Sequence, residues 1–230
     1  MTATRVPLPG QAVGIDGCPG GWIAACLADG SVAWSFAAVA DIATLIPAGA
    51  WVGVDMPIGL LASGLRECDA LARRELPGAA SRVFTTPPRP VLELGPTAPN
   101  ADVQALSRAL SGQGVSRQAL HLAPRILALD AALSALPGHR VVEVHPELAF
   151  AELAGRVLDR KATPEGLQQR VAALGTWLPG VDALLAGRPA GVPVIDALDA
   201  LATLWSAMRW RDGFARTIPS GATEVPFVVV

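Results

Sequence analysis

Short apolar runs alternate with turn residues through the first 60 positions of the chain. The runs cover residues 12–16, 22–28, 31–36 and 51–55. Runs of this length, bounded by Gly, Pro or Asp, are typical of β-strands. Asp29-Gly30, between the second and third runs, is a strong signal for a tight hairpin. The pattern therefore predicts four strands, of which the first three form an antiparallel meander.

The first and fourth runs both end in a carboxylate, Asp16 and Asp55. Residues 39–46 are compatible with a helix, and a crossover through such a helix returns the fourth strand parallel to the first. If the two strands are neighbours, both aspartates lie at the same edge of the sheet. Ligands of open α/β sheets bind beyond the carboxyl ends of the strands, so this edge is the expected site.

Beyond residue 60 the pattern becomes mainly helical. The predicted helices cover residues 65–76, 102–110, 116–136, 164–175 and 194–211. Residues 81–99 contain five prolines and predict a long loop. We expect Pro124 to kink or break the helix that contains it. Residues 140–147 predict a fifth strand that runs into a turn, and residues 225–230 predict a last strand.

No repeat or linker divides the chain, so we expect one α/β domain over residues 1–230 with a helical, Pro-rich insertion at about 61–139. No apolar stretch approaches the 18 residues or more of a membrane span. The first ten residues lack the apolar core of a signal peptide, which favours a cytoplasmic protein. The three cysteines, Cys18, Cys26 and Cys68, are too scattered for a disulfide framework or a zinc cluster.

Composition narrows the classes of function. With 51% hydrophobic and 17% charged residues, the chain is not disordered. Its net charge of −2 is unlike that of a strongly basic, sequence-blind nucleic-acid binder. Any contact with nucleic acid must therefore rely on a local group of arginines.

Carboxylates are the clearest candidates for chemistry. Asp16 and Asp55 end strands, Glu143 lies in the fifth strand, and Asp196 and Asp199 share one face of the last helix. Hydrolysis of a phosphodiester by two metal ions needs carboxylates that hold the ions about 3.5–4 Å apart. The competing explanation is structural: a strand-end aspartate often caps a turn, and a helix N-terminus favours negative charge.

Six motifs in order resemble one family. They are Asp16-Gly17-Cys18-Pro19-Gly20-Gly21-Trp22, Asp55-Met56-Pro57-Ile58-Gly59-Leu60, Arg66-Glu67-Cys68-Asp69 with Ala72-Arg73, Val83-Phe84, Glu143-Val144-His145-Pro146-Glu147 and Asp196-Ala197-Leu198-Asp199-Ala200. Together they resemble the domain-of-unknown-function 429 family, described as predicted RNase H-like nucleases. The resemblance covers roughly residues 12–215.

The resemblance implies an RNase H-like fold, with a mixed five-stranded sheet in the order 3-2-1-4-5, flanking helices and the insertion. It implies catalytic acids at Asp16 and Asp55, a further candidate at Glu143, and a last-helix acid. The last-helix acid is Asp196 or Asp199, and Asp196 is slightly favoured. Mg²⁺ or Mn²⁺ would be held by Asp16, Asp55 and Asp196.

Other residues have a functional and a structural explanation each. His145 is a candidate general base or metal ligand, but a histidine in a turn often bonds only to backbone. Substrate contacts are possible at Arg66, Arg73, Arg82 and Lys161, the only lysine. Arg66 and Arg73 would equally fit an ion-pair network with Asp69 on one helix face. Glu147 shares the turn of His145, and capping that turn would be enough to explain it. Arg89 is a candidate phosphate contact, but a solvated loop charge is the simpler explanation. Cys18 lies beside Asp16, but the spacing shows no histidine that could activate it as a nucleophile.

Three functions remain open. The first is a metal-dependent nuclease or phosphodiesterase that acts on nucleic acid or nucleotides through the strand-end carboxylates. The second is an ATP- or nucleotide-binding protein of the actin-like superfamily, in which the glycine-rich turn at residues 17–21 would cradle phosphate. The third is a non-catalytic binding or scaffold protein that keeps the fold.

Overall fold

One mixed sheet of seven strands runs through the protein in the order β3-β2-β1-β4-β5-β7-β6. The strands are β1 (Ala12–Cys18), β2 (Gly21–Ala28), β3 (Ser31–Ala38), β4 (Trp51–Val54), β5 (Arg140–Val144), β6 (Thr217–Ile218) and β7 (Val228–Val229). Neighbouring strands pair antiparallel between β1 and β2, β2 and β3, and β6 and β7, and the remaining pairs are parallel.

This is a computed structural model, and it describes residues 11–230. The first ten residues, on which the expectation of no signal peptide rests, lie outside the described part. The helices are η1 (Val39–Leu45), α1 (Glu67–Arg74), η2 (Ala80–Arg82), α2 (Arg89–Leu94), α3 (Asn100–Ser111), α4 (Arg117–Ala135), α5 (Pro146–Ala154), α6 (Pro164–Trp177), α7 (Val181–Ala186) and α8 (Val194–Arg211).

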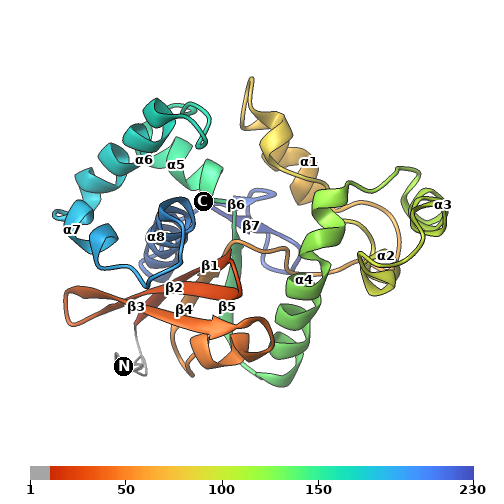
Figure 1. Ribbon diagram of the computed structural model, residues 1–230, viewed down its shortest axis with the longest axis horizontal. Coiled ribbons are helices and arrows are strands. Elements are labelled where there is room, and N and C mark those ends of the chain that lie inside the picture. The colour runs from red at the N-terminus through yellow and green to blue at the C-terminus, as the bar shows by residue number, and fades with distance from the viewer. Residues whose placement is uncertain (1–10) are drawn as a thin grey trace.

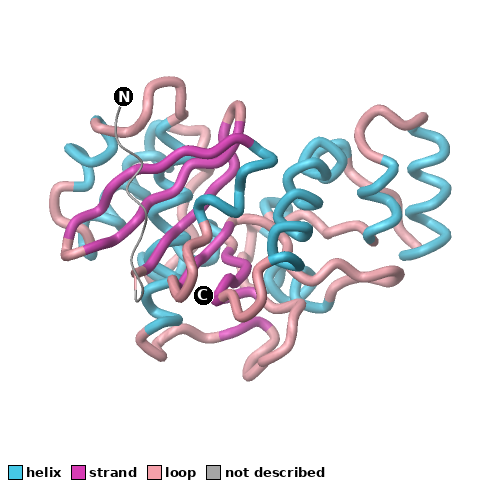
Figure 2. Tube along the Cα trace, turned by 90° about the horizontal axis from the view of Figure 1, so that it is seen from below, coloured by secondary structure: helices cyan, strands magenta, loops and turns pink. Residues whose placement is uncertain are grey.

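Helices cover both faces of the sheet. Figure 1 shows α5, α6, α7 and α8 on one side and α4 on the other, with α2 and α3 beyond α4. Figure 2 shows the strands as one magenta layer with the helices outside it. Alternation along β1 explains this arrangement, because Ala12 and Cys18 join the core with α8 while Val13 and Ile15 join the core with α4. Among residues 11–230, no helix is long and apolar enough to cross a membrane.

Two glycines let α8 lie unusually close to the sheet. A Cβ atom on Gly14 would stand 2.0 Å from the backbone nitrogen of Leu204, and one on Gly53 would stand 2.6 Å from the backbone oxygen of Thr203. Side chains repeat on the same face of a strand every two residues. Asp16 and Asp55, two residues further along their strands, therefore face the side of the sheet that α8 covers.

The sheet differs from the expected five strands because β7 pairs with β5 and β6 pairs with β7. Neither β6 nor the short helix α7 has a strong pattern in the sequence. The expected loop at residues 81–99 contains the end of η2 and all of α2, and the helix expected at residues 39–46 is the 3₁₀ helix η1 at Val39–Leu45. Residues 55–139, between β4 and β5, hold α1 to α4.

Pro124 and Pro146 both lie inside helices, and α4 is not broken at Pro124. Pro124 lies inside α4, which continues through all 19 of its residues. It removes one backbone hydrogen bond, and burial of Ala123 and Ile126 against the sheet offsets this loss. Pro146 does not belong to a simple turn but occupies the first position of α5, where its missing N–H costs nothing.

Candidate functional site

The carboxyl ends of β1 and β4 bring Asp16 and Asp55 together. The backbone N–H of Asp55 donates to the carbonyl oxygen of Ile15 at 2.9 Å, which continues the parallel pairing beyond β4. The two carboxyl groups are close enough for the charge of Asp55 to raise the pKa of Asp16.

The first turns of α8 add Asp196 and Asp199 to the same place. Asp199 is 1% exposed and Asp16 is 7% exposed. Both helix aspartates interact electrostatically with Asp16, and Asp199 also acts on Asp55. Asp16, Asp55, Asp196 and Asp199 are called the aspartate cluster below.

Burial raises the pKa of every carboxyl group in the aspartate cluster, and repulsion by other members adds to it at Asp16, Asp55 and Asp196. Burial is the largest cause at each, and the charges of Asp55 and Asp199 add to it at Asp16. The pKa of Asp55 rises to about 7 through burial and the charge of Asp199. The pKa of Asp196 rises to about 6 for the same two reasons. Crowded, desolvated carboxylates favour a protonated form or a bound cation.

One lysine enters the aspartate cluster from the loop between α5 and α6. The Nζ atom of Lys161 lies 2.6 Å from Oδ2 of Asp199. The side chain of Lys161 is 47% exposed, whereas that of Asp199 is 1% exposed. The other oxygen of Asp199, Oδ1, is buried and has no hydrogen-bond partner in the described part of the chain.

A cavity of about 680 Å³ opens onto the aspartate cluster. All four aspartates and Lys161 line it. Its other walls come from residues 78–86 of the segment between β4 and β5, residues 118–125 of α4, residues 143–147 and residues 160–162. The volume lies in the ordinary range for small-molecule and cofactor sites.

The family comparison covers most of the chain, including all four aspartates. Residues 14–224 match the family described as Protein of unknown function (DUF429). The chain belongs to the DUF429 family. No curated protein and no solved structure matches it.

In this DUF429 protein, Glu143 is engaged by neighbours outside the aspartate cluster. Alternation along β5 directs it to the face opposite Val142 and Val144. Arg66 donates from Nη2 to both oxygens of Glu143, at 2.7 and 2.6 Å, and the backbone N–H of Ile58 donates at 2.8 Å. Burial raises the pKa of Glu143 to about 7, against the opposing charge of Arg66. These contacts describe a structural anchor between β5 and the segment that follows β4.

Three further candidates for substrate contact have protein partners in the DUF429 structure. Arg66, which is 2% exposed, also pairs with Asp69 at 3.1 Å. Arg73 donates to the carbonyl oxygen of Val83. Arg82 lines the cavity, but it donates to Glu147 at 2.6 Å and to a backbone carbonyl. Their present contacts hold the insertion together.

Some of the remaining candidates from the sequence line the cavity, and others only stabilise the fold. His145 lines the cavity with a buried Nδ1 that has no partner among the described residues. Burial lowers the pKa of His145 to about 4, so its ring is neutral at pH 7. Burial raises the pKa of the Cys18 thiol to about 11, which leaves it a poor nucleophile. Arg89 pairs with Asp130 at 2.8 Å.

Two arginines of the cavity were missed by the sequence analysis. Arg125 of α4 donates to the carbonyl oxygen of Cys18 at 2.7 Å and fastens the turn that follows Asp16. Arg160 precedes Lys161 and also lines the cavity. Arg125 could have been found from the sequence, because it is the only charged residue in the apolar stretch of residues 122–129. No local pattern distinguishes Arg160 from other loop arginines.

The donor set of the DUF429 site suits a hard cation only in part. No three His, Cys, Asp or Glu side chains of residues 11–230 are grouped so that they could hold one metal ion by themselves. Mg²⁺, however, is usually bound by one or two carboxylates together with water and substrate phosphate. Asp16 and Asp55 supply two such carboxylates at neighbouring strand ends, and Asp199, whose buried Oδ1 has no partner among the described residues, lines the same cavity.

Proposed function

We propose that this protein is a metal-dependent phosphodiesterase that hydrolyses nucleic acid. The observation that carries the proposal is the convergence of four buried or half-buried aspartates in one cavity with a single lysine ion-paired among them. Burial raises the pKa at all four, and the charges of neighbouring aspartates raise it further at Asp16, Asp55 and Asp196. A divalent cation is the simplest partner that offsets this repulsion.

The sheet supports an RNase H-like assignment within this proposal. Five of its strands follow the order β3-β2-β1-β4-β5, and among them only β2 runs opposite to the others. We infer that β6 and β7 are an addition to this core. A shared sheet does not determine activity, so the proposal depends on the aspartate cluster rather than on the fold.

Asp16 and Asp55 would hold Mg²⁺ or Mn²⁺. The bound ion would supply an activated water and stabilise negative charge on the scissile phosphate. Asp199 would complete the charge around the ion, and we favour it over Asp196 because it is the more deeply buried of the two. The expectation that Asp196 is the preferred ligand is revised on this ground.

The cavity favours one flexible strand or a nucleotide as substrate. Residues 78–86 and residues 160–162 form walls of the same cavity. The exposed side chain of Arg160 is available for a phosphate, since no hydrogen bond or ion pair of its guanidinium group is found among the described residues. The net charge of −2 gives no broad basic surface for a long duplex.

The nucleotide-binding alternative of the actin-like kind has less support. Residues 17 and 18 pair with residues 22 and 21 in the β1–β2 hairpin. Only Pro19 and Gly20 remain in the turn, and proline has no N–H. The turn therefore offers too few free backbone amides to cradle a phosphate.

Calorimetric titration with Mn²⁺ in the presence of a short single-stranded oligonucleotide tests the proposal. We expect saturable binding that the Asp16→Asn, Asp55→Asn double variant loses. The matched control is Asp102→Asn with Asp182→Asn, which removes two exposed carboxylates and should bind like the wild type. The same proteins are then incubated with labelled single-stranded and duplex oligonucleotides, and only the first variant should fail to cleave.

One contact favours the alternative of a non-catalytic scaffold protein. Lys161 already neutralises Asp199 by a 2.6 Å ion pair. If Mn²⁺ binding is absent, or is equal in the wild type and in the Asp16→Asn, Asp55→Asn variant, the aspartate cluster is a structural feature and the scaffold function replaces the nuclease.

A further inference from the structure

We propose that the ammonium group of Lys161 takes the place of a second metal ion, so that the site binds one divalent cation. This inference rests on the proposed function and specifies its site. In the part of the chain that the structure describes, Lys161 is the one cation that makes an ion pair with the aspartate cluster. Its Nζ lies 2.6 Å from Oδ2 of Asp199, and its charge also acts on Asp16 and Asp55.

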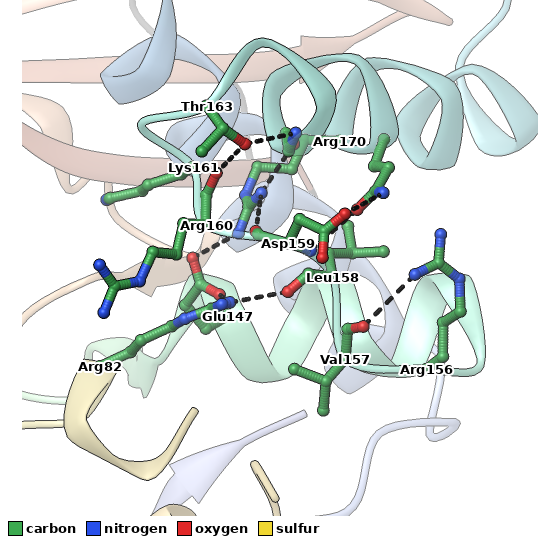
Figure 3. A network of polar contacts seen from close by, with 12 residues as sticks. Arg82, Glu147, Arg156, Val157, Leu158, Asp159, Arg160, Lys161, Thr163 and Arg170 are labelled. Atoms are coloured by element: carbon green, nitrogen blue, oxygen red, sulfur yellow. Dashed lines mark hydrogen bonds and ion pairs between the residues drawn. The ribbon is translucent and has the colours of Figure 1, made fainter. Parts of the chain in front are cut away.

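The loop that carries Lys161 is held in position on both sides. Arg82 donates to the carbonyl oxygen of Leu158 at 2.9 Å, and Arg170 donates to that of Asp159 at 2.9 Å. After Lys161, the hydroxyl of Thr163 accepts from the N–H of Gly166 at 3.1 Å and caps α6. Figure 3 shows these contacts, with Lys161 and Arg160 extending to the same side of the loop.

A buried carboxylate, Glu147, holds the two arginines that fix the loop of Lys161. Glu147 accepts from Arg82 and from Arg170, both at 2.6 Å. The side chain of Arg170 is fully buried. The same two arginines that pair with Glu147 therefore also hold residues 158 and 159. An exposed lysine with a free loop would lose much conformational entropy on pairing, and the anchored loop reduces that loss.

A second divalent cation would compete for the position that Lys161 occupies. Two-metal sites place their ions about 3.5–4 Å apart between shared carboxylates. An ion bound to Asp199 on its Lys161 side would lie within contact distance of the ammonium group. The compact point charge of a lysine repels it there. The oxygens of Asp16 and Asp55 remain open to one ion.

The fixed ammonium group gives the site a positive charge that does not depend on the metal concentration. Lys161 has three N–H donors, and one of them is used by Asp199. The others can reach a phosphate oxygen in the cavity that Lys161 lines. Such a preorganised cation stabilises negative charge as it develops on the phosphate.

The number of bound ions tests the inference without measuring activity. Mn²⁺ is titrated by calorimetry into the wild type, Lys161→Met and Lys161→Arg. We expect one ion per chain in the wild type and in Lys161→Arg, and two in Lys161→Met. Arg156→Ala is the matched control, because it removes a positive charge from an exposed side chain of the same loop. It should bind one ion.

The possible results separate the inference from the proposed function. Two ions in the wild type, or one ion of unchanged affinity in Lys161→Met, would overturn the role of Lys161 and leave the metal-dependent function standing. If the Asp16→Asn, Asp55→Asn double variant binds Mn²⁺ as the wild type does, both the role of Lys161 and the proposed function are overturned. Lys161→Arg keeps the test valid if Lys161→Met does not fold, since a second ion in Lys161→Arg at wild-type stability also contradicts the inference.

Discussion

Two groups of buried carboxylates in this molecule are treated in opposite ways. Asp69, Glu143 and Glu147 each pair with a buried or half-buried arginine, at 2.6–3.1 Å. In the aspartate cluster, four carboxyl groups share Lys161 as the one ion-paired cation among the described residues. The first group joins distant segments of the chain. The second group lies where β1 and β4 end and α8 begins, and both groups line the same cavity.

Under the proposed function, the difference separates charges that stabilise the fold from charges that bind a cation. A buried carboxylate that only stabilises a fold needs its own cation, because an unpaired buried charge is costly. Arg66 and Arg170 meet this need for Glu143 and Glu147. The aspartate cluster lacks it, and the chain keeps the resulting repulsion. Such a cost persists where the missing charge arrives with a ligand.

Removal of an arginine from the first group has the largest expected effect. Arg66→Met leaves Glu143 and Asp69 buried without their common partner. The free energy of unfolding should fall by about 3–5 kcal/mol, the usual cost of breaking a buried pair. Urea denaturation measures it. Adding Glu143→Gln should recover part of the loss, and a loss below about 1 kcal/mol would show that the pair is not structural.

The pH dependence of stability should reveal the raised pKa values of the second group together with that of Glu143. The pKa of Asp55 is raised to about 7, so the folded protein holds its proton more tightly than the unfolded chain does. The free energy of unfolding therefore falls as pH rises toward and through 7, and the raised pKa values of Asp196 and Glu143 act in the same direction.

His145 acts in the opposite direction, because its pKa is lowered to about 4. The unfolded ring has a pKa of about 6.5, so this opposing contribution offsets only part of the fall just above that pH and is complete above about pH 7.5. Between pH 6.5 and 8, with EDTA present, stability should fall by about 1–2 kcal/mol. Denaturation at a series of pH values measures it. A rise in stability over this interval would contradict the pKa shifts of the aspartate cluster.

Replacing an aspartate by asparagine should have opposite effects on stability in the aspartate cluster and at Asp130, an aspartate outside both groups that pairs with its own arginine. Asp55→Asn removes a charge that repels Asp199, and it should raise the free energy of unfolding at pH 8 by about 1 kcal/mol without metal. Asp130→Asn is the control, because Asp130 pairs with Arg89 at 2.8 Å. It should lower stability. Equal signs for the two variants in thermal melting would remove this contrast.

Much of the fold follows from local patterns. Short apolar runs and the Asp29-Gly30 turn predict the first three strands. In the structure these strands lie at residues 12–18, 21–28 and 31–38. The strand-end position of Asp16 and Asp55 is also visible in the sequence. Gly14 and Gly53 carried a further signal, because each lies two residues before an aspartate and allows α8 to approach the same face.

The pairings within the site could not be predicted in the same way. Lys161 meets Asp199 across 38 positions of sequence, and Arg66 meets Glu143 across 77. Such contacts depend on the packing of whole elements, which no period of two or 3.6 residues encodes. Glu143 shows the consequence. Its place in a strand suggested a role like that of Asp16, but the ion pair with Arg66 decides its environment.

The smallest expected change in stability comes from breaking an ion pair between an arginine and a glutamate at the surface. Arg216 pairs with Glu75, and the two side chains are 44% and 34% exposed. Water screens this pair, so Arg216→Ala should change the free energy of unfolding by less than about 1 kcal/mol. It removes the same charge as Arg66→Met. Urea denaturation of both variants under one condition therefore isolates burial as the cause of the difference, and a similar loss in each would mean that charge count alone decides stability.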